Sequence, residues 1–202
     1  MSLIIFHITV FVLLATLFSK QIHRYRYIIY SIAAVLILIL IDSEVNVLTL
    51  GYTGISFFII VMYTGVLEKG YITKKLRQVR AEYAVLGTLS ILPHALIYLE
   101  YILDDIGILN ISLSPIFGLI AMVIIVPLFI TSFHFVRRKM TYVQWKRLHQ
   151  LSYLFYGLLG LHLILIQNNR QIYYIVIFLG YLILRLWAMV SKYNKHRVLK
   201  EN

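Results

Sequence analysis

Cysteine is absent from this chain of 202 residues, and that absence excludes disulfide, thiol and iron–sulfur chemistry. Charge is scarce as well: Asp, Glu, Lys and Arg make up 13% of the residues, against about a quarter in soluble domains. The P-loop, the dinucleotide motif GxGxxG and the zinc motif HExxH do not occur in the sequence. Apolar residues instead account for 61% of the chain. Such a composition is typical of a membrane protein.

The apolar residues are grouped into seven long runs. These runs cover residues 3–19, 27–41, 52–67, 83–103, 115–136, 149–167 and 172–191. A helix that crosses a bilayer needs about 20 apolar residues, within a range of about 17–25, and most runs fit. The second run is shorter because Arg26 and Asp42 bound it, but a snorkelling Arg26 can extend it. The sequence therefore predicts an all-α fold, a polytopic membrane helix bundle with about seven transmembrane helices.

Basic residues mark alternate connections between these runs. Seventeen of the 19 lysines and arginines fall in four segments, at 20–26, 69–80, 137–147 and 192–200. The intervening connections carry acidic residues and a single basic one, Arg170. Because basic connections stay cytoplasmic, we expect the N-terminus outside, the C-terminus inside, and a multi-pass protein of the cell membrane. The spread of the positive charge over four segments argues against nucleic-acid binding.

Histidines supply the candidate functional groups. Five of the seven lie in spans or at their ends, namely His7, His94, His134, His149 and His162. An ionisable side chain inside a bilayer is costly, so each is a candidate for function. The alternative role is hydrogen bonding between helices, which contributes about 0.6–2 kcal/mol.

The depth of these residues can be calculated from helix geometry. His94 lies twelve residues beyond Glu82, or about 18 Å into a helix that runs from inside to outside. His162 lies seventeen residues beyond Trp145, or about 25 Å into a second helix of the same direction. Both histidines therefore belong to the outer half of the membrane.

A second pair lies near the inner surface, because Arg80 precedes His94 by fourteen residues and His149 lies about 20 Å below His162. A porphyrin between two helices needs one axial ligand from each at one level, and His94 with His162 meets this requirement. His149 could hold a second haem further in, with Arg80 as a ligand or propionate partner, or with His134.

The spacing within the second helix raises a difficulty. Fourteen residues make nearly four helical turns, so Arg80 and His94 share a face. Thirteen residues make about 3.6 turns, so His149 and His162 do not share one in an ideal helix. Either two haems lie at different azimuths or this helix is distorted.

With these residues in view, the sequence resembles the ferric reductase-like transmembrane domain superfamily over about residues 50–190. Within it, the chain is most similar to the haem-binding membrane subunit of the periplasmic methionine-sulfoxide reductase system. The motifs that carry the resemblance are Thr53-Gly54, Arg80 with His94, and Trp145, Leu148-His149, Leu151, Tyr153 and His162. The pattern departs from the family's in one extra N-terminal helix, so we expect residues 1–26 to form that helix and 27–202 a six-helix haem-binding domain.

The resemblance implies an electron-transfer subunit of a transmembrane reductase with one or two b-type haems, ligated by His94, His162 and His149. About a dozen residues follow the last apolar run, so we expect no flavin or nicotinamide domain in this chain. The donor would then be a cytosolic flavin reductase with FMN or FAD, free flavin, or membrane quinol. The acceptor outside would be a reductase subunit, a flavoprotein, ferric iron or oxygen. The alternative is a non-redox membrane transporter or scaffold whose histidines pack or handle protons.

Overall fold

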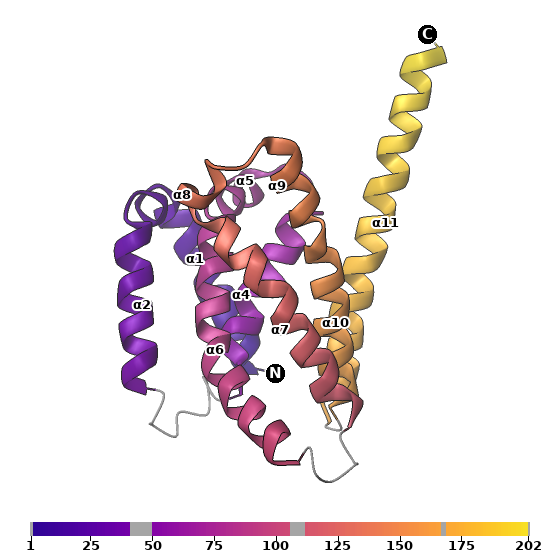
Figure 1. The fold of residues 1–202 in the computed structure, drawn as a ribbon. Coiled ribbons are helices and arrows are strands. Elements are labelled where there is room, and N and C mark those ends of the chain that lie inside the picture. Colours follow the sequence, from indigo (N-terminus) through magenta and orange to yellow (C-terminus); the bar gives the residue numbers. More distant parts are fainter. Residues whose placement is uncertain (1, 41–49, 106–111, 167–168, 202) are drawn as a thin grey trace.

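The structure, a computed structural model, describes residues 2–40, 50–105, 112–166 and 169–201, and every regular element in these ranges is an α-helix (Figure 1). The long helices are α1 (Ser2–Arg24), α2 (Arg26–Leu40), α4 (Tyr52–Thr64), α6 (Arg80–Asp105), α7 (Leu113–Ser132), α10 (Leu151–Leu165) and α11 (Gln171–Glu201). The short helices are α5 (Tyr71–Gln78), α8 (His134–Arg137) and α9 (Tyr142–His149), and all three lie at one end of the bundle. The all-α prediction is confirmed for the described residues.

Five helical stretches in the described ranges are long and apolar enough to cross a membrane. They are Ser2–Arg24, Arg80–Glu100, Leu113–Ser132, Tyr142–Leu165 and Gln171–Asn194. Two further apolar helices, Arg26–Ile39 and Tyr52–Thr64, are shorter than a bilayer normally requires. The expected seven spans are thus supported for five helices, and the count of seven stays a prediction.

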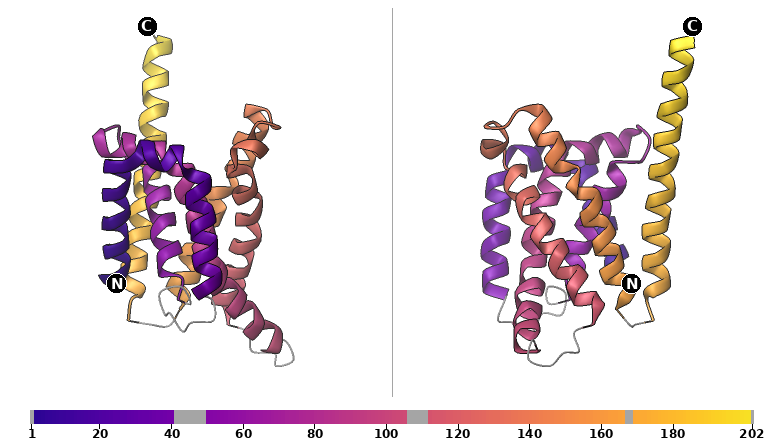
Figure 2. Two further views of the ribbon diagram at one scale, coloured as in Figure 1. Left: turned by 90° about the vertical axis from the view of Figure 1, so that its left-hand side faces the viewer. Right: turned by 45° about the vertical axis from the view of Figure 1, so that its right-hand side comes forward.

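Helix α4 forms the centre of the bundle although it has only 13 residues. Residues 54–62 of it are all buried, because protein surrounds the helix on every side. It packs against α1 and α6, while α7 packs against α10. Helices α2 and α11 lie at opposite flanks (Figures 1 and 2).

Two glycines bring α4 and α6 together. A Cβ atom on Gly54 would lie 3.0 Å from the backbone oxygen of Gly87, and one on Gly87 would lie 3.0 Å from Cβ of Phe57. The absence of side chains therefore allows the two helices to approach closely. This contact positions α6, which carries His94.

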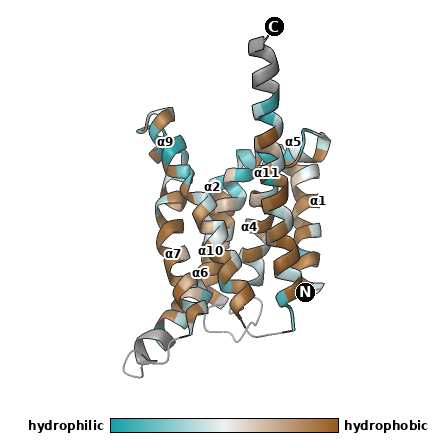
Figure 3. Ribbon diagram, turned by 90° about the vertical axis from the view of Figure 1, so that its right-hand side faces the viewer, coloured by the Kyte–Doolittle hydropathy of each residue, from teal (hydrophilic) through white to brown (hydrophobic). Residues whose placement is uncertain are grey.

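The two ends of the bundle differ in polarity. The α1–α2 turn, α5, α8 and α9 lie at the same end, beyond which the C-terminal part of α11 extends (Figures 1 and 2). This end is hydrophilic, whereas the helix bodies are hydrophobic (Figure 3). The four basic segments thus share one end, as alternate connections require. The assignment of that end to the cytoplasm stays a prediction.

Helices α1 and α2 are tied to the bundle by polar contacts. The Tyr83 hydroxyl donates to the backbone oxygen of Phe11 at 2.5 Å. Nδ1 of His23 lies 2.8 Å from Oε1 of the buried Glu82, and a nitrogen of Arg26 lies 3.9 Å from the same oxygen. His23, which was not among the candidate functional histidines, therefore has a structural role in joining α1 to α6.

Candidate functional site

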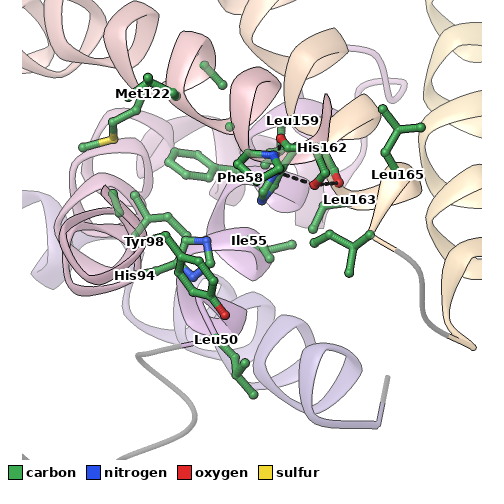
Figure 4. A pocket seen from close by; sticks show the side chains of 18 of the residues that line it. Leu50, Ile55, Phe58, His94, Tyr98, Met122, Leu159, His162, Leu163 and Leu165 are labelled. Atoms are coloured by element: carbon green, nitrogen blue, oxygen red, sulfur yellow. Dashed lines mark hydrogen bonds between the residues drawn. The ribbon is translucent and has the colours of Figure 1, made fainter. Parts of the chain in front are cut away.

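A cavity of about 620 Å³ lies at the end of the bundle opposite the basic segments, and Figure 4 shows side chains that line it. Its wall is mainly apolar and comes chiefly from α4, α6, α7 and α10, together with residues at the start of α11. Both outer histidines, His94 and His162, lie in this wall. The volume falls within the range of about 300–1,000 Å³ found for small-molecule and cofactor sites.

The rings of His94 on α6 and His162 on α10 lie next to each other in an edge-on arrangement. Their centroids are 6.2 Å apart and their planes are inclined by 67°. A metal ion bonded to one nitrogen of each ring, at about 2 Å per bond, fits between rings at such a separation. The expectation that these two residues lie at one level is consistent with this geometry.

His162 is held in one orientation by Ser114 of α7. Its Nδ1 lies 2.8 Å from the backbone oxygen of Ser114, and the Ser114 hydroxyl donates to the backbone oxygen of His162 at 2.9 Å. An Nδ1–H that donates to a carbonyl leaves the lone pair on Nε2, which is how metal-binding histidines are commonly oriented. The ring also needs Gly118, since a Cβ atom there would lie 2.9 Å from Nδ1.

His94 follows Pro93 in α6 and packs against Tyr98, with ring centroids 4.6 Å apart. Gly51, at φ 69°, lies beside it just before α4. A Cβ atom on Gly51 would come within 2.6 Å of Ile91 Cδ1 and 3.4 Å of His94 Cγ. Both the left-handed backbone and the lack of space require glycine here.

His149 and Arg80 lie toward the other end of the bundle and are not among the residues that line the cavity. Nε2 of His149 lies 3.1 Å from the Thr131 hydroxyl, and its ring packs on Trp145 with centroids 4.3 Å apart. Arg80 is close enough to His149 to act on it electrostatically, and it makes a side-chain hydrogen bond to Tyr156. The structure thus brings Arg80 and His149 into one neighbourhood.

His134 is exposed on α8, beyond the end of α7. Its pKa is lowered from the ordinary value of 6.5, chiefly by the positive charge of Arg138. Arg26, Arg137 and His23 also act on it. Basic side chains therefore surround His134 at the surface, whereas His149 contacts Thr131 and Trp145.

The helix that carries His149 and His162 is interrupted at Gln150, between α9 and α10. Backbone hydrogen bonds there join residues three apart, from Gln150 to Arg147 and from Tyr153 to Gln150. Such tightening turns the two histidines relative to each other. Of the two explanations considered for their spacing, helix distortion is present in the structure.

Sequence reasoning missed the residues that orient the outer pair. Ser114 followed by Pro115 resembles an N-cap and a first helical residue. The structure instead has Ser112 as N-cap, and Ser114 lies inside the first turn with its side chain committed to His162. No local signal reveals this contact, because 48 residues separate the partners.

The two histidines can be compared with what a haem requires of the protein. In the described part of the chain, no three His, Cys, Asp or Glu side chains come together. Histidine imidazoles are common ligands of haem iron, and the two that line this mainly apolar cavity would be able to hold one. The residues present therefore fit a haem between His94 and His162.

Fold and cavity together define a helical membrane protein with two opposed histidines. The model of the "Ferric reductase like transmembrane component" family matches residues 49–160, and the chain belongs to this family. The chain is a multi-pass membrane protein, and the family suggests a role in membrane electron transfer. The matched range includes Arg80, His94 and His149 and ends two residues before His162.

The chain is also 31% identical over 224 aligned residues to a protein of Treponema pallidum (strain Nichols) that is named "Uncharacterized protein". The alignment covers 95% of this chain and 62% of that relative, so the chain spans under two thirds of the relative's length. No solved structure matches the chain.

Proposed function

We propose that the protein is an electron-transfer subunit that binds haem b between His94 and His162 and passes electrons across the membrane. The observation that supports this proposal is that His94 and His162 lie next to each other in a mainly apolar cavity, with His162 oriented by the Ser114 carbonyl. A haem b bound there supplies one-electron transfer between ferric and ferrous iron. His94 and His162 would hold the iron, the Ser114 carbonyl would orient the His162 ring, and the mainly apolar wall would limit the access of water.

An inner site would hold a second haem b at His149, with Arg80 or His134 as the competing partner. The contact of Arg80 with Tyr156, and its electrostatic reach to His149, support Arg80. The indole Nε1 of Trp145, beside His149, is buried without a hydrogen-bond partner among the described residues. A buried donor of this kind suits the carboxylate of a cofactor.

Electrons would enter at the basic end, from a cytosolic flavoprotein carrying FMN or FAD, from free flavin, or from membrane quinol. The exposed Arg137 lies 4.4 Å from the centre of the Trp145 ring, which in turn packs on His149. These contacts lead from the surface at residues 137–147 to the inner site. The acceptor at the other end would be a reductase subunit, a flavoprotein or ferric iron. The similarity to the methionine-sulfoxide reductase subunit favours the first.

The test is spectroscopic. The purified protein should show a Soret band and reduced-state bands of six-coordinate haem b, and His94→Ala and His162→Ala should each remove the outer haem. A matched control is His7→Ala, which lies in α1 and does not line the cavity. Full haem retention in both cavity variants would sink the ligand assignment. A wild-type protein without haem would favour the alternative hypothesis of a non-redox transporter or scaffold.

The donor is tested in proteoliposomes. Docking on a basic face should slow steeply as ionic strength rises, whereas quinol arrives through the bilayer and is indifferent to salt. Reduction is therefore measured across a salt series, once with a flavin reductase and NADPH and once with a short-chain quinol. Reduction by quinol alone, at a salt-independent rate, would exclude the flavin donor.

A further inference from the structure

Arg170 lines the same cavity as His94 and His162. It lies immediately before α11, at the end of the bundle away from the four basic segments. The positive-inside tendency explains the seventeen basic residues in those segments, but it does not explain an arginine here. The presence of an arginine at this end of the bundle therefore needs a different explanation.

The Arg170 side chain is fixed over the cavity by Tyr52, the first residue of α4. An Arg170 nitrogen donates to the Tyr52 hydroxyl, and its guanidinium carbon lies 5.5 Å from the centre of the Tyr52 ring. The buried Tyr174, one turn into α11, completes this corner of the wall. The guanidinium is therefore held at the cavity by packing as well as by a hydrogen bond.

Helix ends of both polarities meet at this opening. Helices α4, α7 and α11 all begin here, and Tyr52, Ser112 and Arg170 from their first turns or caps all line the cavity. The N-terminal end of a helix carries about half a positive charge. The C-terminal end of α10 also lies here and carries the opposite half charge, so the helix ends offset one another in part. Arg170 therefore supplies the full positive charge in a wall that is otherwise mainly apolar.

We propose that Arg170, positioned by Tyr52, binds a carboxylate at the opening of this cavity. The inference rests on the proposed function, because the ligand we favour is a carboxylate side chain of the haem between His94 and His162. A planar guanidinium matches a carboxylate and forms charge-assisted hydrogen bonds with it. The same chemistry would recognise an external electron acceptor that bears carboxylates, such as a ferric chelate.

A purely structural role for the pair, as a brace between α4 and α11, is the competing explanation. The chain contains a matched control for it: Arg185 donates to the Tyr153 hydroxyl at 2.6 Å, with its guanidinium 4.5 Å from the ring centre. This second pair braces α11 against α10 and does not line the cavity. If substitution of Arg170 and substitution of Arg185 change haem binding alike, the role of both pairs is structural. If only the substitution of Arg170 weakens haem binding, Arg170 contacts the ligand.

The experiment titrates haem-free protein with haem b and with its dimethyl ester, which lacks free carboxylates. Arg170→Gln should weaken haem b binding by about tenfold or more, the effect of losing a charge-assisted hydrogen bond. The ester should bind wild type and Arg170→Gln equally, and Arg185→Gln should bind both ligands as the wild type does. Arg170→Lys, which keeps the charge, should recover part of the affinity. Thermal unfolding of each haem-free variant checks its fold.

A second arm separates the two sources of carboxylate. If Arg170→Gln binds haem b normally but is reoxidised more slowly by ferric citrate, with no change for the cationic hexaammineruthenium(III), the carboxylate belongs to the external acceptor. The proposal is overturned if Arg170→Gln matches Arg185→Gln in haem binding and in both reoxidation rates. A wild type that takes up neither haem nor its ester overturns the proposed function as well. Failure of the proposed function is therefore seen in the wild type itself. Failure of the Arg170 proposal alone is seen when the wild type and Arg170→Gln both take up haem equally well.

Discussion

Ser114 and His162 hold each other through two hydrogen bonds of opposite direction. His162 Nδ1 lies 2.8 Å from the Ser114 carbonyl, and the Ser114 hydroxyl lies 2.9 Å from the His162 carbonyl. The first contact sets which ring nitrogen faces the cavity, and the second joins α7 to α10. A partner of this kind typically changes the affinity of a metal site by about 10–100-fold.

Ser114→Ala keeps the backbone carbonyl beside His162 Nδ1 but removes the hydroxyl that donates to the His162 backbone oxygen. We therefore expect haem binding to weaken by up to about tenfold, the effect of losing one neutral hydrogen bond. Haem titration of the purified variant measures this. Ser132→Ala is the control, because among the described residues that hydroxyl donates to the Leu128 carbonyl within α7. Equal affinity in the two variants would contradict a positioning role for Ser114.

Gly118→Ala should displace the His162 ring, since the added Cβ would lie 2.9 Å from Nδ1. Overpacking of this kind costs about 1–3 kcal/mol, so we expect a lower unfolding temperature and loss of the outer haem. Gly157→Ala, in the same bundle, meets nothing within 4 Å and should leave both unchanged or slightly raise stability. Differential scanning fluorimetry and absorbance spectra report the two effects.

Glu82→Gln should loosen α1 and α2 from α6. The buried carboxylate bonds His23 and lies near Arg26, and a charge-assisted bond of this kind contributes about 1–3 kcal/mol. We expect the lower end, because His23 is largely exposed and solvent screens the pair. The unfolding temperature in detergent measures the loss, with the exposed Glu68→Gln as control. No difference between the two variants would mean that the cluster does not anchor α1 and α2.

His134→Ala should leave haem content as in the wild type, whereas His149→Ala and Arg80→Ala should each reduce the inner haem. Pyridine haemochrome assays give the ratio of haem to protein. The positive charge of Arg138 lowers the pKa of His134 from its ordinary value of 6.5, so the midpoint of its protonation moves to lower pH. Arg138→Gln should raise that pKa, and an NMR titration of the ring protons detects the shift. Inner haem loss in His134→Ala would overturn the preference for Arg80.

Apolar run lengths and alternate basic segments were sufficient to predict the helical bundle and the common end of the basic segments. The spacing of His94 from Glu82 and of His162 from Trp145 was sufficient to predict one level for the two residues, because rise per residue is a local property of a helix. The interruption at Gln150 could not be located in advance. Glycine is the residue type that most readily permits a bend, yet Gly157 and Gly160 both lie inside α10.

The sequence by itself determined which residues could lie in the membrane and how deep. It did so because hydropathy and helical rise depend only on the residues in one segment. Only the tertiary structure decided which side chains surround the histidines: the Ser114 carbonyl, the space left by Gly118, and Arg170 held by Tyr52. Each of these contacts joins helices that are distant in the chain, and the rotation of one helix against another is set by packing across the whole bundle.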